Sequence, residues 1–315
     1  MIPLQGMASN RLTVITYFHA NEKQLHRCIE GLASQSYKQF EWWVLTHSPI
    51  TENISIPYKE VLLPAAVTNK SEAYNYVLPQ ITTDYIAYND GDDRSLPHRF
   101  ALQVALLDQQ PEISVCSGAC VVNDTQLGWP VYSTYDDIVA FLLINNPIVN
   151  PAVMLRNLEG VWGDEIKYNP RYIRAQDYDF WFSCLKMDLQ FYNFTDPLLS
   201  YYVPDVPPVN DTQENFAITI RQEIWQWGGM SLDKRYSKAF DDFCIIRKIP
   251  EQELLVLMNH LKKKRYKKPF QNGAKIIANY LDTYITNHGM RDNEALLNCI
   301  SLLKKPYLLR LILEK

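Results

Sequence analysis

TTDYIAYNDGDDRSLPHRF, residues 82–100, joins an apolar run to a group of acidic residues. It places the apolar run at residues 85–88 directly before three aspartates, Asp90, Asp92 and Asp93. A short apolar run of this kind is typical of a strand that is buried on both faces. In open α/β sheets, ligands bind where the strands end at their carboxyl edge. The sequence therefore predicts a buried strand that leads directly into a polar site.

The three aspartates allow two interpretations. Carboxylates this close together repel one another unless they share a positive charge, and a divalent cation that prefers oxygen ligands would meet that need and would also bridge a diphosphate. The alternative is a surface turn, because Asn89-Asp90-Gly91 is typical of turns and Asp93 could cap a following helix. On this stretch alone both interpretations stay open.

Strand and helix signals alternate on either side of this stretch. Runs rich in β-forming residues read as strands buried on both faces; they lie at residues 12–18, 40–46, 60–64, 85–89 and 113–122. Asn21 and Gln24 resemble a capping box before a helix, and two further helices are expected at residues 71–78 and 96–107. The alternation predicts an open, mostly parallel α/β sheet.

The character of the chain changes after the proline-rich residues 203–211. From residue 212 onward the strand signals disappear, and apolar residues recur at helical spacing before Gly228, after Pro250 and before Gly289. We therefore expect two domains, an α/β domain at residues 1–208 and a domain of four or five helices at residues 209–315.

Composition narrows the class of protein. The 315 residues are 47% hydrophobic, which is enough for a large core, and the net charge of -4 disfavours a nucleic-acid partner. Six cysteines without paired spacing are typical of reduced thiols in a cytosolic protein. The start lacks the order of a secretion signal, and polar residues and prolines interrupt the longest uncharged stretch, residues 138–155, so we expect neither export nor a membrane span.

Four segments, taken in order, resemble the family 2 glycosyltransferases of the GT-A fold. The segments are VITYFHAN (14–21), LASQSYKQFEWWVL (32–45), residues 71–113 and RAQDYDFWFSCLKMDLQFYNFTDPLLSYYV (174–203). The resemblance covers residues 10–205. It implies a Rossmann-like, mostly parallel sheet flanked by helices, to which the all-helical C-terminal part is an appendage.

The resemblance implies a donor site and a metal site. Asp90 and Asp92 match the family's DxD pair: Asp92 would ligate Mg²⁺ or Mn²⁺ directly, and Asp90 would contact the ribose or the metal through water. Asp93 is a further candidate at the same turn. The residues implied to bind the donor are Thr16, Tyr17, Asn75, Asp90 and Gly91.

The resemblance also implies a catalytic base. Asp177 matches the second position of the family's Glu-Asp motif and would accept the acceptor's proton, so that an in-line displacement inverts the anomeric configuration. The alternative is that Asp177 caps the helix that follows it. Asn150 and Gln176 are the implied acceptor contacts, although Asn150 could equally be a satisfied loop amide.

Several positions depart from the family's pattern. THSPITE (46–52) stands where the family carries acidic residues that hold the base and the ribose. Tyr74 replaces the family's Arg, so one cation on the phosphate side is missing, and Gln176 replaces a Glu. Residues 202–204 offer no third metal ligand. These departures leave open a non-catalytic subunit that binds or scaffolds a nucleotide sugar, although keeping Asp90, Asp92 and Asp177 together argues for an enzyme.

The resemblance implies an inverting, metal-dependent transfer of one sugar from a nucleoside-diphosphate donor to a glycan or lipid-linked glycan, in bacterial surface polysaccharide synthesis. The expected donor is uridine-linked. No Gly-rich, lysine-bearing phosphate loop lies near the start, which argues against a nucleotidyltransferase. Basic residues at 261–269 and 302–315 suit a peripheral contact with anionic lipid or a homodimer, and a solvated helix face explains them equally well. The expected location is the cytoplasm, including the inner face of the membrane.

Overall fold

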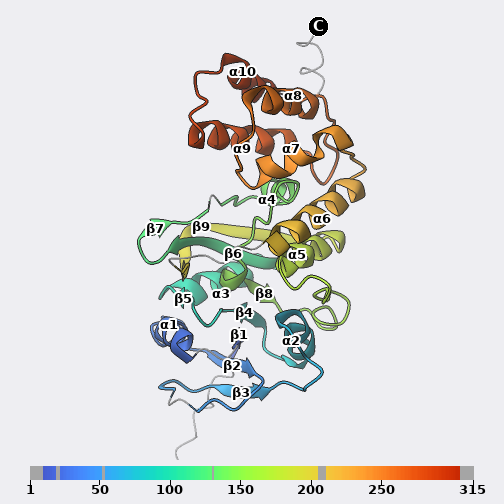
Figure 1. The fold of residues 1–315 in the computed structure, drawn as a ribbon. Helices are drawn as coiled ribbons and strands as arrows, with labels where there is room; N and C mark the ends of the chain where they lie inside the picture. Colours follow the sequence, from blue (N-terminus) through green and yellow to red (C-terminus); the bar gives the residue numbers. More distant parts are fainter. Residues whose placement is uncertain (1–9, 19–21, 52–53, 130, 205–210, 306–315) are drawn as a thin grey trace, which may run out of the picture. The chain divides into compact units, whose positions relative to one another are not determined.

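The computed structural model describes residues 10–18, 22–51, 54–129, 131–204 and 211–305 (Figure 1). The chain divides into two units. The first takes its residues from 1–134 and 148–210, and the second from 135–147 and 211–315. Asn21 of the expected capping box, the expected boundary at residue 208 and the last ten residues of the basic tail lie outside the described residues.

Among its described residues, the first unit contains a mixed sheet of nine strands (Figure 1). Its strands, in spatial order, are β3 (Lys59–Leu62), β2 (Phe40–Thr46), β1 (Leu12–Tyr17), β4 (Tyr85–Tyr88), β8 (Met154–Arg156), β6 (Ile113–Val122), β9 (Gln190–Tyr201) and β5 (Arg94–Ser95), and β7 (Gln126–Leu127) pairs with β6. The first four strands are parallel, whereas β8 is antiparallel to both of its neighbours. The predicted α/β fold is confirmed, with β8 making the sheet mixed.

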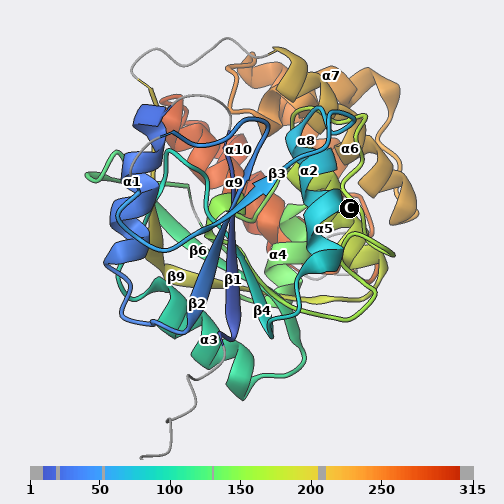
Figure 2. The ribbon, with the colours of Figure 1, turned by 90° about the horizontal axis from the view of Figure 1, so that it is seen from below.

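Helices cover both faces of this sheet. Apolar side chains of α1 (Glu22–Ala33) and α3 (Arg99–Gln109) share one core cluster with alternate residues of β1, β2 and β4. On the opposite face, α2 (Lys70–Val77) packs Tyr74 on Tyr88 of β4, and α5 (Gln176–Lys186) lies on the same side as α2 (Figure 2). The expected helices at 71–78 and 96–107 therefore exist with slightly shifted ends.

One strand differs from its prediction. The segment at residues 60–64 was expected to be buried on both faces, but β3 has only half-buried and exposed residues. The reason is its place in the sheet, because β3 is an edge strand that pairs with β2 alone among the described strands. An apolar run by itself does not distinguish an edge strand from a central one.

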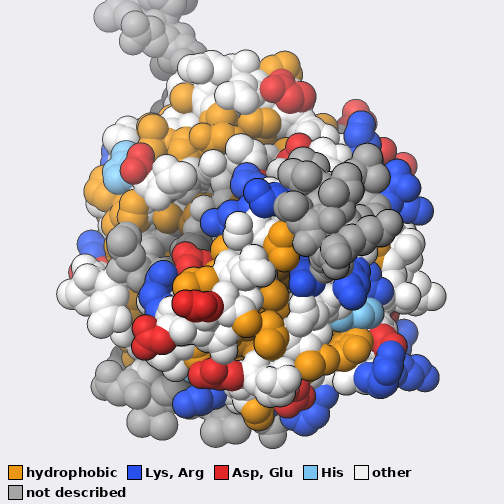
Figure 3. All heavy atoms as spheres, turned by 90° about the horizontal axis from the view of Figure 1, so that it is seen from above, with side chains coloured by type: hydrophobic (Ala, Val, Ile, Leu, Met, Phe, Trp, Pro, Cys, Tyr) orange, Lys and Arg blue, Asp and Glu red, His pale blue; other side chains and the backbone are white. Residues whose placement is uncertain are grey.

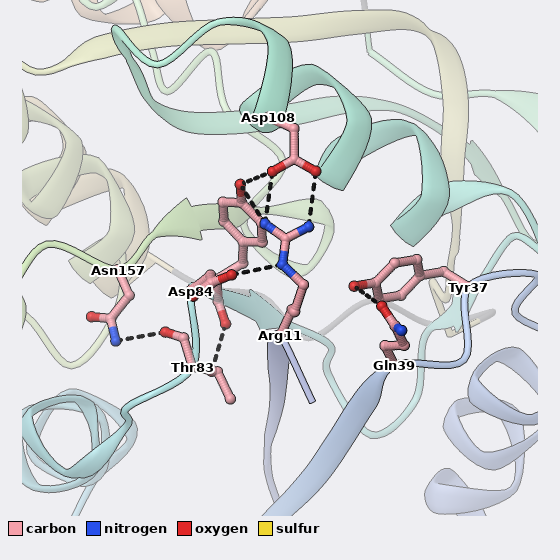
Figure 4. A network of polar contacts seen from close by, with 8 residues as sticks. Arg11, Tyr37, Gln39, Thr83, Asp84, Asp108 and Asn157 are labelled. Atoms are coloured by element: carbon pink, nitrogen blue, oxygen red, sulfur yellow. Dashed lines mark hydrogen bonds and ion pairs between the residues drawn. The ribbon is translucent and has the colours of Figure 1, made fainter. Parts of the chain in front are cut away.

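At the edge of the sheet where β1 and β4 begin, ion pairs of Arg11 connect the starts of these strands with the end of α3 (Figure 4). Arg11 precedes β1 and donates Nε to Asp84 (2.7 Å) and both terminal nitrogens to Asp108 at the end of α3 (2.9 and 2.8 Å). These hydrogen bonds lower the pKa of Asp108 to about 2. Strands β1 and β4 run parallel, so their carboxyl ends, and the aspartates that follow β4, lie at the opposite edge.

A close approach joins α1 to the segment after the aspartates. A Cβ placed on Gly31 would lie 2.6 Å from the backbone nitrogen and 3.0 Å from the carbonyl oxygen of Ser95 in β5. We expect Gly31→Ala to lower the free energy of unfolding by about 1–3 kcal/mol, because backbone must shift to admit the methyl group. Urea denaturation checks this result, with the exposed Glu30→Ala on the same helix as the control. Equal midpoints for the two variants would contradict the close approach.

The second unit is helical throughout its described elements. The helices are α4 (Tyr135–Phe141), α6 (Asp211–Trp227), α7 (Lys234–Cys244), α8 (Glu251–Leu261), α9 (Gly273–Asn287) and α10 (Glu294–Leu303). The predicted C-terminal helical appendage is confirmed in α6–α10. Of the helices in the described ranges, none is long and apolar enough to cross a membrane.

The segment 135–147 belongs to the helical unit, although it lies within the expected first domain. Asp137 of α4 accepts hydrogen bonds from Asn272 Nδ2 (2.7 Å) and Lys275 Nζ (2.9 Å) of the α9 region. Arg221 and Trp225 of α6 donate to the carbonyl oxygens of Ile144 (2.8 Å) and Leu143 (2.9 Å). These contacts are between residues far apart in the sequence, which a linear reading of the chain does not reveal.

Candidate functional site

The turn that follows β4 is built around Asn89. This buried side chain donates from Nδ2 to the carbonyl oxygens of Asp90 (2.8 Å) and Asp93 (3.2 Å). Its Oδ1 accepts hydrogen bonds from Ser95 Oγ (2.5 Å) and Arg99 Nη1 (3.3 Å). The amide thus fixes the backbone on both sides of Gly91 and Asp92, so the positions of the aspartates depend on this internal side chain.

Arg99 supports the same turn from α3. It is fully buried, and its Nη2 donates to the carbonyl oxygens of Tyr88 (2.7 Å) and Val153 (3.0 Å). Its Nε donates to Gln103 (3.1 Å), which in turn donates to the carbonyl oxygen of Ala152 (2.8 Å). Burial lowers the pKa of Arg99 to about 9. One internal network therefore connects the end of β4 to the 3-10 helix Asn150–Ala152.

The three aspartates occupy different environments. Asp93 is 1% exposed, and its Oδ1 accepts the backbone N–H of Tyr202 (2.8 Å). Burial first, and then the charges of Asp90 and Asp92, raise the pKa of Asp93 well above its usual range. The idea that Asp93 caps the next helix is wrong, because α3 begins at Arg99 with His98 as its N-cap. Asp93 instead holds the end of β9 to the turn.

Asp90 and Asp92 are half-buried, which leaves them partly accessible. Burial raises the pKa of Asp92, and the neighbouring charge of Asp90 adds to that rise. Asp90 Oδ1 accepts a hydrogen bond from Lys70 Nζ at 2.5 Å. Arg27 of α1 donates Nε to the carbonyl oxygen of Asp92 (2.9 Å) and Nη2 to Ser200 Oγ (3.0 Å). Two cations therefore border the pair of carboxylates.

The candidate base, Asp177, shares this electrostatic environment. It lies in the first turn of α5, and its Oδ1 accepts the backbone N–H of Tyr178 (3.0 Å). Burial raises its pKa; the charge of Lys70 lowers it and that of Asp90 raises it. The N-cap of α5 is Ala175, in the left-handed region at φ 53°, so the alternative that Asp177 is the capping residue is wrong. Left-handed backbone at a non-glycine residue is strained and is often found at functional sites.

An aromatic stack connects the elements that carry these groups. Tyr74 of α2 stacks on Tyr88 of β4 with ring centroids 4.9 Å apart, and its ring lies 5.3 Å from that of Tyr168. Tyr168 stacks in turn on Phe180 of α5 at 4.0 Å. All four rings are almost completely buried. The stack therefore holds α2, the end of β4 and α5 together, and with them Lys70, Asp90 and Asp177.

The predicted donor-binding residues lie in varied surroundings. Gly91 and Thr16 are neighbours, since a Cβ on Gly91 would lie 3.9 Å from Thr16 Cγ2. The Thr16 hydroxyl is buried and accepts the indole N–H of Trp42 (3.0 Å). Tyr17 is partly exposed and contacts His47 Nε2 through its hydroxyl (3.3 Å), which places His47, one of the residues that depart from the family's pattern, at this edge of the sheet.

Asn75 has a structural partner. Its Nδ2 donates to the carbonyl oxygen of Tyr168 (2.7 Å), and its Oδ1 accepts the N–H of the same residue (2.8 Å). This two-way contact fixes the loop that carries the middle ring of the stack. A role of Asn75 in donor binding therefore stays a prediction, and the structure shows a supporting role.

The two predicted acceptor contacts each carry a buried oxygen that lacks a hydrogen-bond partner within the described residues. The atoms are Asn150 Oδ1 and Gln176 Oε1. A buried, unpaired carbonyl oxygen costs free energy and is uncommon in native structures. A ligand hydroxyl could supply the missing donor, so the two amides are consistent with acceptor binding, which stays a prediction.

The acidic turn fits a magnesium or manganese ion that is completed by a substrate. In the described ranges, no group of three or more His, Cys, Asp or Glu side chains is arranged to hold a metal ion. Asp90 and Asp92 provide two half-buried carboxylates on one turn. Mg²⁺ is commonly bound by one or two carboxylates together with substrate phosphates and water. Asp92 and Asp90 are thus suitable ligands when a diphosphate is present.

Comparison with known proteins gives matches to glycosyltransferases. Residues 13–174 match the family model described as Glycosyl transferase family 2. An uncharacterized glycosyltransferase, MJ1057 of Methanocaldococcus jannaschii, is 24% identical over 208 residues, which are 61% of this chain and 70% of that protein. The amylovoran biosynthesis glycosyltransferase AmsE of Erwinia amylovora is 24% identical over 195 residues, 58% of this chain and 72% of its own length.

Solved structures match the fold. TarS of S. aureus gives a TM-score of 0.50 at 15% identity, over 90% of this chain and half of that longer chain. Its 1–349 portion in complex with UDP-GlcNAc gives a TM-score of 0.51 at 13% identity, over 93% of this chain and 90% of that one.

Proposed function

We propose that this chain, which belongs to glycosyl transferase family 2, transfers a sugar from a nucleoside-diphosphate donor to a glycan or glycolipid acceptor with inversion at the anomeric carbon. One observation carries the proposal. The buried aromatic stack joins α2, the end of β4 and α5, and so holds the turn with Asp90 and Asp92, which suit a cation and a diphosphate, to the helix with Asp177, which suits a base. Transfer requires both kinds of group, since negative charge develops on the leaving diphosphate while the acceptor hydroxyl loses a proton.

In the proposed mechanism, Asp177 accepts the proton of the acceptor hydroxyl at a carboxylate oxygen. Its raised pKa makes it a stronger base than an exposed aspartate. Asp92 and Asp90 would hold Mg²⁺ or Mn²⁺, which neutralises the charge on the departing diphosphate when bound. Asn89 and Arg99 keep the two aspartates in place through the contacts to Asp90, Asp93 and Tyr88. The acceptor attacks from the face opposite the leaving group, which is why the configuration inverts.

Relatives support the proposed donor and the proposed pathway. A uridine diphosphate sugar is proposed because the TarS structure contains UDP-GlcNAc, and surface polysaccharide synthesis because AmsE is named for amylovoran biosynthesis. Tyr17 and His47 lie together at the edge where the family's acidic segment is replaced. We infer that these two residues contribute to recognition of the nucleotide.

The basic residues at 261–269 bear on a proposed contact with a membrane or with a second copy of the chain. Tyr266 is buried and anchors the run, and Lys264 Nζ donates to the carbonyl oxygen of Ser231 (2.6 Å). Figure 3 shows basic side chains interspersed with acidic and apolar ones on the face that it draws. Contact with anionic lipid at the inner face of a membrane, or with a second copy of the chain, stays a prediction.

Nucleotide binding and turnover together test the proposed function. We expect UDP-sugars with Mn²⁺ to raise the melting temperature by about 5 °C or more at a hundredfold excess over Kd, because a ligand of the folded state stabilises it. Asp92→Ala should remove this shift and reduce transfer about 10²-fold, because it removes a ligand of the charge-neutralising ion. The exposed Asp196→Ala serves as the control and should behave like the unmodified chain.

Two outcomes would change the assignment. Metal-dependent nucleotide binding without turnover over a panel of donors and acceptors would favour a non-catalytic subunit that binds or scaffolds nucleotide sugars. The absence of any shift with nucleotide sugars would contradict a donor site at the acidic turn.

A further inference from the structure

Lys70 is a basic side chain in direct contact with Asp90, a carboxylate of the acidic turn. It begins α2, and its Nζ lies 2.5 Å from Asp90 Oδ1. The side chain is 22% exposed, so most of its surface is covered while a path to solvent remains. The position was missed in the sequence because nothing in a lysine at the start of a helix indicates a distant aspartate as its partner.

The surroundings keep Lys70 charged. Its Nζ pairs with Asp90 Oδ1 at 2.5 Å, and an opposite charge at this distance favours the charged form of the ammonium group. The Nζ atom also lies 5.5 Å from the ring centroid of Tyr74, which is held in the aromatic stack. An aromatic face attracts a cation. Lys70 therefore carries a positive charge at the turn at neutral pH.

Arg27, the second cation that borders Asp90 and Asp92, makes structural contacts. Arg27 donates to the carbonyl oxygen of Asp92 and to Ser200 Oγ, and it also pairs with Asp124 at 3.2 Å. Its guanidinium is therefore held by three structural partners and makes no direct hydrogen bond to the carboxylate of Asp90 or Asp92 in the described part of the chain. Lys70 has one strong acceptor, Asp90, and a flexible four-carbon stem. Of these two residues, Lys70 is the one that can change its partner without breaking the framework.

We propose that Lys70 is an exchangeable counter-ion, which neutralises Asp90 while the donor is absent and moves to the donor diphosphate when a metal ion and donor bind. The inference rests on the proposed function. A divalent cation near Asp90 repels an ammonium group at hydrogen-bond distance from the same carboxylate, whereas a diphosphate offers that group new oxygen partners. Lys70 would thus disfavour binding of the metal alone and favour binding of the metal together with the donor.

Binding measurements on Lys70→Met test the proposal, because methionine keeps an unbranched stem without the charge. We expect Mn²⁺ alone to bind the variant about threefold or more tightly than the unmodified chain, since a repelling charge is gone. UDP in the presence of saturating Mn²⁺ should bind about tenfold more weakly, since a charge-assisted hydrogen bond is lost. Titration calorimetry measures UDP, and electron paramagnetic resonance measures free Mn²⁺.

Two further variants serve as comparisons. Lys38→Met makes the same change at an exposed lysine outside the turn and should leave both affinities unchanged. Lys70→Arg keeps the charge and should keep the weak binding of Mn²⁺ alone; it also tests the charge if Lys70→Met fails to fold. In that case the comparison is between Lys70→Arg and Lys70→Gln.

The proposal requires that loss of the charge strengthens the binding of Mn²⁺ alone and weakens the binding of UDP with Mn²⁺. If removing the charge weakens both ligands or changes neither, Lys70 is a structural residue and the proposal is wrong. An unmodified chain that binds no UDP would contradict the proposed function instead, and the manganese comparison would still show whether Lys70 competes for Asp90.

Discussion

Asp177→Asn is expected to reduce transfer about 10³-fold while leaving donor affinity unchanged, because a positioned general base contributes about 10²–10⁴-fold to a rate. Asparagine has nearly the shape of aspartate and can still accept the N–H of Tyr178, but it cannot take a proton from the acceptor. Initial rates at saturating donor measure the loss, and calorimetry with the UDP-sugar measures donor affinity. Equal loss of donor affinity would place Asp177 in the donor site instead.

The pH dependence of transfer by the unmodified chain provides a second measurement. Burial raises the pKa of Asp177, so transfer should be lost as the pH falls through a value above the usual aspartate pKa of about 4. A raised pKa also means that ionisation of Asp177 disfavours the folded state, so removing the charge should not lower the melting temperature at neutral pH. A rate that stays constant down to pH 4, or an unfolded variant, would contradict this account.

Arg99→Met is expected to lower the free energy of unfolding by about 3–5 kcal/mol, because it removes donors from several buried acceptors. The carbonyl oxygens of Tyr88 and Val153 would lose their Arg99 hydrogen bonds, and Asn89 Oδ1 would lose one of its two partners. Urea denaturation measures the change. The exposed Gln109→Met on the same helix controls for the substitution itself and should cost less than about 0.5 kcal/mol.

Arg99→Lys distinguishes the guanidinium from its charge. Lysine keeps the charge but not the planar set of donors, so it should recover only part of the lost stability. If Arg99→Met and Gln109→Met unfold at the same urea concentration, the network around the turn does not hold it in place.

The alternation of elements was enough to predict the α/β fold, because central strands such as β1 and β4 carry a continuous apolar run. Strand β9 was not predicted as a strand, since half-buried and exposed residues interrupt its apolar ones. The two-residue strands β5 and β7 are too short for any periodicity. Edge position, which makes β3 exposed, depends on strand order rather than on the composition of the strand itself.

The candidate site residues were named from local motifs. Asp90 and Asp92 follow a buried strand, whereas Asp177 was named by its match to the family's Glu-Asp motif, and the roles of all three stay predictions. Asn89, Lys70 and Arg99 were missed for a different reason. Their partners lie as far as 61 residues away in sequence, as for Asn89 and Cys28, and a single sequence gives no sign of such contacts.

The place of segment 135–147 matters for any attempt to divide the protein. It leaves the sheet-bearing unit after Thr134, completes the helical unit, and re-enters the first unit at Ile148. A fragment ending at residue 208 would keep Ile138, Val139 and Leu143 but lose α6 and α9, whose side chains contact this segment. Because the two units are interleaved in sequence, no single cut separates them. Each fragment, expressed alone, would expose hydrophobic surface that is buried in the whole chain, and we expect it to aggregate.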